Sequence, residues 1–324
     1  MVVRFRRCSC TLALSCSIAS LQAHLSSAIT LTKSESNGEL GWLRLPSSSN
    51  TSGGILSSGV ATYVGTGNTA YVDAAVMLGL SLQRHLPSLP RYCLAPADLD
   101  IRSRDLLSAA GWSVVALEAG GSRAPDGAKT CVASTLCQEF YNKMSVFRLP
   151  LERVLWLDAD TLVLSADLQR VLSTELPFGH IAMVHDCCRP VYNSGLMWLQ
   201  PNVTTFNAMQ RMPMGKKQGD QDLINDAFAG KIVALEARFN THGYKSMSCD
   251  DVVVAHFTGR RKPTFPDLKH LDSVRTGEKS KQAKVFNFQC AGLYKQYFCG
   301  LKDNWQHLSR ELQLALAVSP PCQS

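Results

Sequence analysis

Several features that would assign a chain to a class at once are scarce or missing here. Charged residues make up only 18% of the 324 residues, and beyond Ala23 no apolar stretch reaches the ~18–20 residues of a membrane-spanning helix. We therefore expect no membrane span in the mature chain. Basic residues are not interleaved with aromatic ones along a stripe, so the formal charge of +7 does not indicate a nucleic-acid partner. The sequence also shows no internal repeat.

Acidic residues are absent before Glu35, and this absence marks a separate amino-terminal segment. Three arginines among the first seven residues, an apolar stretch over 11–23 and small residues at 26–28 follow the pattern of a secretory signal peptide. We predict removal of residues 1–28 and a mature chain in the secretory lumen or outside the cell. The same Arg- and Ser-rich start also suits an organelle transit peptide, and a cytoplasmic location is a further alternative. Without this segment the formal charge falls from +7 to +4.

The twelve cysteines include no CxxC spacing, so we expect no structural zinc site. Three of them lie in the predicted leader, which leaves an odd number and hence one unpaired thiol. Other spacings suit local disulfides and glycosylation in an oxidising compartment. The residues concerned are Cys131 with Cys137, Cys290 with Cys299, and the sequon asparagines Asn50 and Asn202.

Short apolar runs alternate with helical patterns from about Val60 onward. The runs at 60–64, 92–94, 112–117 and 153–157 are separated by predicted helices over 71–86, 98–110 and 139–149. This alternation predicts βαβ units, and therefore a Rossmann-like α/β fold whose mostly parallel sheet has helices on both faces. Such sheets bind ligands at the carboxyl ends of their strands.

The rest of the chain is predicted to flank one domain over 60–265. Residues 29–59 are expected to be a linker, since 46–59 are rich in Ser and Gly. The aperiodic stretch 119–137 predicts a long loop that could cover a site. Residues 266–324 are expected to be a basic and helical extension. Its helix is indicated by the spacing of Trp305, Leu308, Leu312 and Leu316.

Two carboxylates follow the apolar strand predicted over 153–157. Asp158 and Asp160 are two residues apart, so in an extended chain they point to the same side and converge at the sheet edge. Carboxylates this close repel each other unless one is protonated or a cation lies between them. A divalent metal would satisfy both and could bridge to the diphosphate of a nucleotide donor. The alternative is that each aspartate caps a turn, which is the usual role of an isolated DxD.

Two further segments place polar residues beside apolar ones. Asn193 and Ser194 precede the apolar run 196–199, where they could bind sugar hydroxyls or simply form a turn. Asp220 is placed to begin a helix and could face a donor. Asp222 cannot share a metal with Asp220, because a helix separates positions i and i+2 by about 200°.

The last segment is an apolar strand over 252–257 that delivers His256 to a glycine-containing turn. A histidine at the end of a strand is usually structural. As a third ligand beside two carboxylates, however, its nitrogen would favour Mn²⁺ over Mg²⁺. Lys262 in the following turn could reach a phosphate.

In this order the four segments resemble the motifs of the glycogenin and galactinol synthase group, the family 8 retaining glycosyltransferases of the A-type fold. The resemblance covers about residues 60–263. The family motifs DADT, NSG, GDQ and HFxGxxKPW are matched in this sequence by Asp158-Ala159-Asp160-Thr161, Asn193-Ser194-Gly195, Gly219-Asp220-Gln221 and His256 to Pro263.

The resemblance implies roles for the matching residues. Asp158, Asp160 and His256 would bind Mn²⁺. A larger set of residues would hold the donor. In this set Tyr71 would stack on the base, and Lys143 and Lys262 would balance the phosphate charge. That set is Thr66, Asn68, Tyr71, Lys143, Asp158, Ala159, Asp160, Asn193, Ser194, Gly195, Gly259 and Lys262. At the reacting end Asp220 and Gln221, with Lys143, would act in catalysis, and with Asn193 they would orient the sugar.

The expected function is therefore transfer of a hexose, with retention, from UDP-glucose or UDP-galactose to a small-molecule, glycan or protein acceptor. A homodimer is left open. Two departures from the family are Thr264 in place of tryptophan and Lys217-Gln218 where glycogenin carries a catalytic acid, which leaves the acceptor undefined. Self-glycosylation at Tyr244 is a weaker hypothesis.

Two other functions can be weighed against this one. A catalytically silent sugar-nucleotide or glycan-binding protein could have the same fold. A phosphatase of the haloacid dehalogenase type also begins with an apolar strand and DxD. That motif is expected near the amino terminus and requires Thr or Val where Leu162 stands, so the phosphatase is disfavoured.

Overall fold

The computed structural model describes most of the region predicted to fold. The described ranges are 56–65, 69–117, 135–212, 218–242 and 247–258, with single residues or short pieces at 43, 45, 297, 299–300, 308–310 and 312–313.

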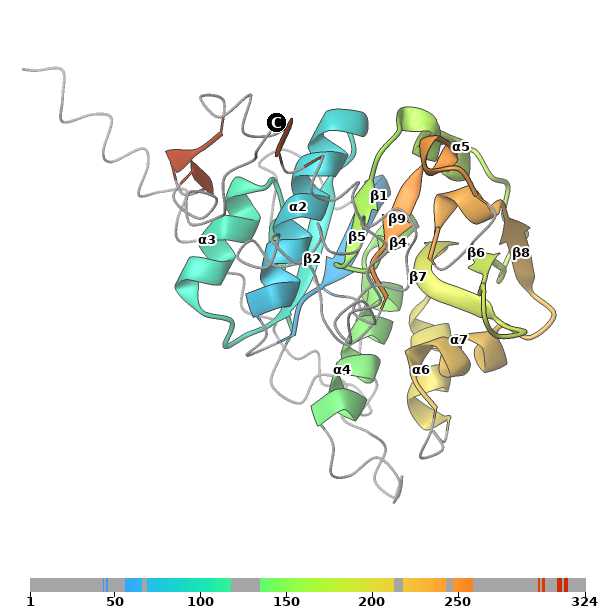
Figure 1. Cartoon of the computed structure of the whole chain (residues 1–324). Helices are drawn as coiled ribbons and strands as arrows, with labels where there is room; N and C mark the ends of the chain where they lie inside the picture. Colours follow the sequence, from blue (N-terminus) through green and yellow to red (C-terminus); the bar gives the residue numbers. More distant parts are fainter. Residues whose placement is uncertain are drawn as a thin grey trace, which may run out of the picture.

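A seven-stranded sheet in the order β3-β2-β1-β4-β7-β6-β8 forms the centre of the molecule (Figure 1). Its strands are β1 (Leu56–Tyr63), β2 (Arg91–Pro96), β3 (Ser113–Leu117), β4 (Leu151–Leu157), β6 (Ile181–His185), β7 (Tyr192–Leu199) and β8 (Ile232–Leu235). Strand β7 runs antiparallel to both of its neighbours, and the remaining pairings are parallel. A small second sheet pairs β5 (Thr161–Val163) with β9 (Val254–His256) in antiparallel orientation.

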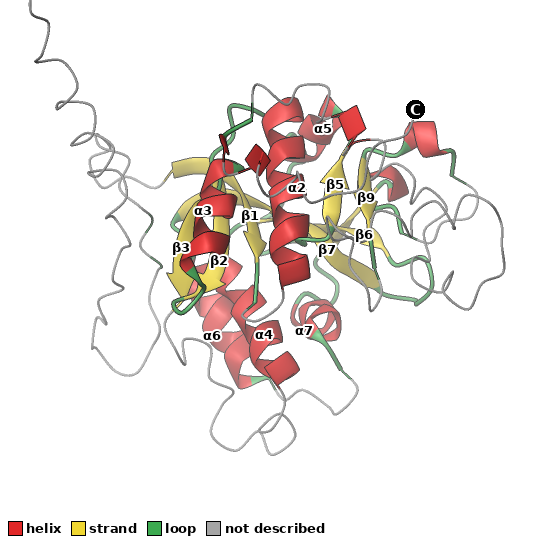
Figure 2. Ribbon diagram, turned by 60° about the vertical axis from the view of Figure 1, so that its left-hand side comes forward, coloured by secondary structure: helices red, strands yellow, loops and turns green. Residues whose placement is uncertain are grey.

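Helices cover the two faces of the sheet, as Figure 2 shows. One face carries α2 (Thr69–His85) and α3 (Ile101–Ala109). The other carries α4 (Thr135–Met144), which continues into a 3₁₀ turn (Ser145–Arg148), together with α6 (Val203–Arg211) and α7 (Asp220–Ala227). A short helix, α5 (Gln169–Leu172), follows β5. The predicted α/β class, with a mostly parallel sheet and helices on both faces, is confirmed.

Strand β4 shows why the sequence favours this layered arrangement. Successive side chains of a strand point to opposite faces, so an apolar run without polar interruption needs a core on each side. Leu155 and Leu157 belong to the core beneath α2 and α3, whereas Val154 and Trp156 belong to the core beneath α4, α6 and α7. All four are buried, which places the carboxyl end of β4 in the interior of the sheet.

Two element boundaries lie earlier in the chain than the sequence predicted. Strand β1 begins at Leu56, inside the predicted linker, and Leu43 is also buried, with its N–H donated to the Arg148 carbonyl at 2.8 Å. The Ser/Gly composition is misleading because Gly59 lies against Tyr92, whose ring would be 2.9 Å from an added Cβ. Helix α4 begins at Thr135, so the predicted 119–137 loop ends earlier than expected.

The carboxyl-terminal extension is described only in part. Leu312 is buried in the core beneath α2, and Leu308 packs against the same core. Trp305, Leu316 and the basic stretch 260–284 lie outside the described residues. No helix in the described part of the chain has the length and apolar character needed to cross a membrane.

Candidate active site

The site is built where β4 ends and β7 begins. Because the two strands are antiparallel, the amino end of β7 lies beside the carboxyl end of β4, with Leu157 opposite Leu196. The Asp158 N–H donates to the Gly195 carbonyl at 2.8 Å. The Asn-Ser-Gly segment is therefore part of a strand and not the turn considered as an alternative. Two motifs far apart in the sequence meet in space.

Asp158, Asp160 and His256 converge as predicted. One ligand atom of each lies within 4.8 Å of the others. The His256 Nε2 atom is 3.5 Å from Asp160 Oδ1 and 3.9 Å from Asp158 Oδ2. Pairing of β5 with β9 sets Thr161 opposite His256, which brings the histidine to the second aspartate. Two carboxylate oxygens and one imidazole nitrogen are a donor set that suits a divalent transition metal.

The two oxygens of Asp158 have different partners. Its Oδ1 accepts a hydrogen bond from Trp156 Nε1 at 2.8 Å and forms an ion pair with Lys143 Nζ at 2.7 Å. Its Oδ2 is the atom nearest His256. The positive charge of Lys143 thus relieves part of the expected repulsion between the aspartates. The other oxygen of Asp158 is directed toward His256 and Asp160, and these three residues are called the metal corner below.

Lys143 connects the metal corner to the amino end of α7. Its buried ammonium group also binds Asp220 Oδ2 at 2.7 Å and the Ser194 hydroxyl at 3.0 Å. Burial alone would lower the pKa of Lys143, but the charges of Asp158 and Asp220 raise it above its ordinary value. The resemblance implied contact with the donor. The structure places the lysine between two carboxylates, where it balances their charge.

Asp220 is held ionised by this arrangement. Burial would raise its pKa, but the charge of Lys143 and hydrogen bonds from Lys143 and Ser194 keep the pKa of Asp220 below its ordinary value. Asp222 faces elsewhere, accepting from the Gly219 N–H and pairing with Arg189. The two carboxylates of α7 have separate partners, in agreement with the helical geometry argued from the sequence.

A second carboxylate cluster was missed by the sequence analysis. Asp186 follows β6, and its Oδ2 accepts hydrogen bonds from Gln221 Nε2 at 3.1 Å and Asn193 Nδ2 at 3.2 Å. Its Oδ1 accepts from the Cys188 N–H at 2.9 Å. Burial would raise the pKa of Asp186, but these hydrogen bonds lower it below its ordinary value. The signal available in the sequence was an aspartate one residue beyond the apolar run 181–184, comparable to Asp158, which directly follows its own run.

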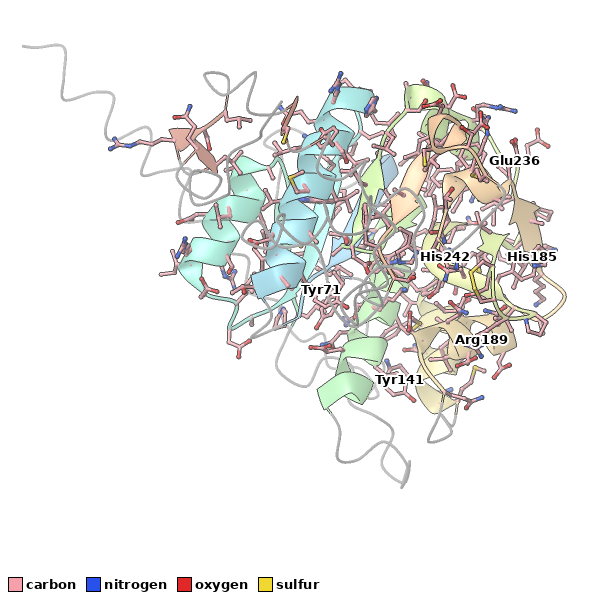
Figure 3. The ribbon with its side chains drawn as sticks, in the orientation of Figure 1. Tyr71, Tyr141, His185, Arg189, Glu236 and His242 are labelled. Atoms are coloured by element: carbon pink, nitrogen blue, oxygen red, sulfur yellow. A yellow bond between two sulfur atoms is a disulfide. The ribbon has the colours of Figure 1, made fainter. Side chains whose placement is uncertain are left out.

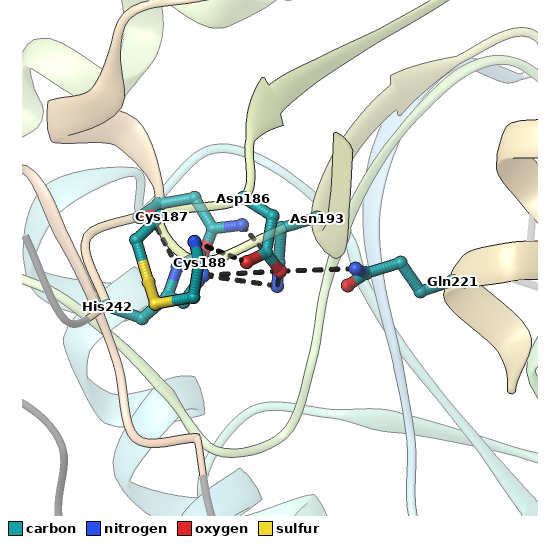
Figure 4. Close-up of a disulfide and its surroundings, with 7 residues drawn as sticks. Asp186, Cys187, Cys188, Asn193, Gln221 and His242 are labelled. Carbon is teal, nitrogen blue, oxygen red and sulfur yellow. Dashed lines mark hydrogen bonds and ion pairs between the residues drawn. A yellow bond between two sulfur atoms is a disulfide. The ribbon is translucent and has the colours of Figure 1, made fainter. Parts of the chain in front are cut away.

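The neighbours Cys187 and Cys188 form a disulfide beside Asp186 (Figure 4). Asp186, Cys187 and His242 otherwise have the spacing of a metal site. A cysteine binds a metal through its thiolate, however, and the sulfur of Cys187 is already bonded to that of Cys188. Within the described part of the chain, Asp158, Asp160 and His256 are therefore the one candidate metal group that keeps its full donor set when these cysteines are oxidised.

Other cysteines and predicted site residues are placed as follows. Cys249 and Cys299 are each in a disulfide, and Cys93 is a free buried thiol whose pKa burial raises. Tyr71 lies near the amino end of α2, partly buried against the core (Figure 3). Ala159 is buried between the two aspartates. The following lie outside the described residues: Thr66, Asn68, Lys217, Tyr244, Gly259, Lys262, Thr264, Cys131 and Cys290.

No protein-family model and no curated protein sequence matches the chain. Solved structures similar to it include the galactosyltransferase LgtC in complex with donor and acceptor sugar analogues, at 16% identity and a TM-score of 0.51, covering 74% of this chain and 94% of LgtC. The bifunctional glycosyltransferase WbbM has 14% identity and a TM-score of 0.54, with 83% of this chain and 53% of WbbM covered. GlyE of Streptococcus pneumoniae TIGR4 has 15% identity and a TM-score of 0.52, over 83% of this chain and 66% of GlyE.

These likenesses identify the architecture. The expected A-type glycosyltransferase fold is confirmed by the mixed seven-stranded sheet and by its solved neighbours. Identities of 14–16% show a shared fold and leave donor, metal and stereochemistry to be argued from the residues themselves. The chain also spans only about half the length of WbbM.

The charge balance at Lys143 gives a direct test. Replacing Lys143→Met leaves the partly buried Asp158 and Asp220 without their cation, so the free energy of unfolding at pH 7 should fall by about 3–5 kcal/mol. Because the pKa of Asp220 is lowered in the folded state, the pair stabilises the fold above the unfolded-state pKa of about 3.9 and ceases to do so as the pH falls below it. Urea denaturation at pH 7 and at about pH 2 should therefore give a smaller loss at the lower pH.

The matched control is Lys231→Met, since Lys231 is exposed. Its effect should stay within about 0.5 kcal/mol at both pH values. Equal stability of wild type and Lys143→Met at pH 7 would contradict the assigned charge balance.

Proposed function

We propose that this chain is a metal-dependent glycosyltransferase that moves a hexose from UDP-glucose or UDP-galactose to an acceptor with retention, as in family 8. The observation that supports this most strongly is the convergence of Asp158, Asp160 and His256 at the carboxyl end of β4, directly beside Asn193 and Ser194 of β7. Metal and sugar ligands are thus adjacent in the fold shared with known glycosyltransferases. The resemblance of the motifs favours Mn²⁺ and retention.

The metal would be held by Asp158 Oδ2, an oxygen of Asp160 and His256 Nε2. Bound there, a divalent cation would offset the negative charge of the departing diphosphate. Lys143 pairs with Asp158 Oδ1 and with Asp220 Oδ2, and its ion pair with Asp158 does not use Asp158 Oδ2. The protein side of the site is therefore charged and oriented before a donor arrives, which is the condition for electrostatic catalysis.

The sugar end of the site is organised around the amides of Gln221 and Asn193. Both donate to Asp186 Oδ2, so Asp186 fixes which end of the Gln221 amide faces the site. A carboxylate only accepts hydrogen bonds, hence Gln221 must present its oxygen on the other side. Asp220, Gln221 and Asn193 would orient the hexose while the acceptor oxygen bonds to the anomeric carbon, the bond from that carbon to the UDP oxygen breaks, and the hydroxyl proton passes to the departing UDP. We further propose that Thr66, Asn68, Tyr71, Gly259 and Lys262 hold the nucleotide and diphosphate.

We propose a secretory or extracellular location, in agreement with the leader pattern. The disulfides at Cys187–Cys188, Cys249 and Cys299 support this, because such bonds persist in oxidising compartments.

The mature protein should begin near residues 24–29. Alkylation in denaturant without reductant should label Cys93 but neither Cys187 nor Cys188. A chain that begins at Met1 and is labelled at both neighbours would contradict the proposal.

Donor turnover tests the proposed activity without knowledge of the acceptor. The purified protein is incubated with Mn²⁺ and, in turn, UDP-glucose, UDP-galactose, UDP-xylose and UDP-glucuronate, and released UDP is measured. Asp160→Asn keeps the shape but removes a ligand charge, so turnover of the best donor should fall by about 10²-fold or more. Chelator should abolish turnover by the parent protein.

Asp226→Asn, an exposed change on α7, is the matched control and should leave turnover unchanged. Full turnover by Asp160→Asn in buffer that contains chelator would remove the metal from the account. UDP binding without turnover of any donor would favour the alternative, a silent sugar-nucleotide-binding protein on the same fold.

A further inference from the structure

His256 has a second nitrogen that faces away from the aspartates. Its Nδ1 lies 2.9 Å from Asn240 Oδ1, and both side chains are buried. The two residues are held in register by the backbone, because Thr241 N–H donates to the Val254 carbonyl and His256 N–H donates to the Thr241 carbonyl. Asn240 therefore cannot move away from the imidazole without breaking strand pairing. The sequence analysis gave this asparagine no role.

The orientation of the Asn240 amide can be worked out from a backbone group. Gly195 N–H lies 2.8 Å from one end of the Asn193 amide. A backbone N–H only donates, so that end of Asn193 must be the oxygen. The same oxygen is 2.8 Å from one end of the Asn240 amide, which must then be the NH₂ group. The other end of Asn240, the one that faces His256, is consequently its oxygen.

An independent contact gives the same orientation for Asn193. Its opposite end lies 3.2 Å from Asp186 Oδ2, and an ionised carboxylate can only accept. That end must therefore be the NH₂ group, as the Gly195 contact also requires. His242 agrees with this orientation: its Nδ1 faces the Asn240 carbonyl at 3.1 Å and donates to it, so in the neutral ring Nε2, 3.4 Å from Asn193 Nδ2, accepts from the Asn193 NH₂ group.

The chain of hydrogen bonds ends at the imidazole. Since Asn240 Oδ1 accepts only, Nδ1 of His256 must carry a hydrogen. We propose that Asn240, oriented by Asn193, is a positioning residue that fixes the hydrogen of His256 on Nδ1 and so presents Nε2 as the metal ligand. This inference rests on the proposed metal site. Partners of this kind, which bind the far nitrogen of a ligating histidine, set its ring orientation and tautomer.

Gly195 contributes to this arrangement in two ways. Its N–H begins the chain of hydrogen bonds, and its lack of a side chain admits the imidazole, because a Cβ there would overlap the His256 ring. The glycine of the Asn-Ser-Gly motif thus supports the metal corner as well as the strand. A single motif on β7 both lies beside the aspartates and orients the third ligand.

The state of Nδ1 can be measured directly. The full chain is labelled with ¹⁵N-histidine, and the His256 signals are assigned by their loss in His256→Ala. Nδ1 should report a bound hydrogen both without metal and with Mg²⁺ as a diamagnetic stand-in. An Nδ1 without hydrogen in either state would overturn the inference.

Removal of the amide should weaken metal binding. Asn240→Leu has nearly the same shape but no hydrogen-bonding groups, so the Kd for Mn²⁺, measured by electron paramagnetic resonance, should rise about 10–100-fold. Asn202→Ala is the matched control: it removes an asparagine that caps α6 by accepting from the Thr205 N–H, and should leave the Kd unchanged. Unchanged affinity in Asn240→Leu would contradict the positioning role.

These readouts separate the inference from the proposed function. Weakened Mn²⁺ binding in Asn240→Leu, combined with no donor turnover by the wild type, would support the positioning role and reject the glycosyltransferase activity. A wild type that binds no Mn²⁺ would reject the metal site on which the proposed activity depends. In that case a hydrogen on Nδ1 would still support the orientation that Asn240 imposes.

Discussion

The antiparallel pairing of β4 with β7 is the constraint on which the rest of the site depends. In a sheet of parallel strands alone, the amino end of every strand lies at the opposite edge from the carboxyl ends. Reversing β7 brings Asn193, Ser194 and Gly195 to the edge where Asp158 and Asp160 emerge. The hydrogen bond from Asp158 N–H to the Gly195 carbonyl fixes the two motifs relative to each other. The residues proposed to bind metal and sugar therefore belong to one structural unit.

Charge is the second constraint, because this edge collects carboxylates. Lys143 satisfies Asp158 and Asp220 together, and amide groups and a backbone N–H satisfy Asp186. The same side chains that neutralise the carboxylates also fix their orientation. Asp158 keeps one oxygen directed toward His256, and Asp186 sets the Gln221 amide. A site organised in this way needs little rearrangement when a charged donor binds, which is the property expected for electrostatic stabilisation of a leaving diphosphate.

Much of this could be predicted from the sequence because local patterns determine it. The apolar run of β4 needs two cores, and residues two apart in an extended chain share a side, so the alternating strands and the convergence of Asp158 with Asp160 followed directly. The partners of Lys143, the role of Asn240 and the cluster around Asp186 could not, since they depend on contacts between separate segments, 77 residues apart for Lys143 and Asp220, or on the reversal of β7, which no local pattern encodes. The Ser- and Gly-rich start of β1 was misread for a related reason. Its glycine is required by contact with Tyr92, which is distant in sequence.

The central claim is that one divalent cation binds where β4, β7 and β9 meet. Its most direct test is anomalous scattering at the manganese edge from crystals grown with Mn²⁺ and UDP. The account predicts one peak within coordination distance of Asp158, Asp160 and His256 Nε2, with the UDP phosphates completing its ligands. A peak between Asp186 and His242, or no ordered manganese beside bound UDP, would contradict it.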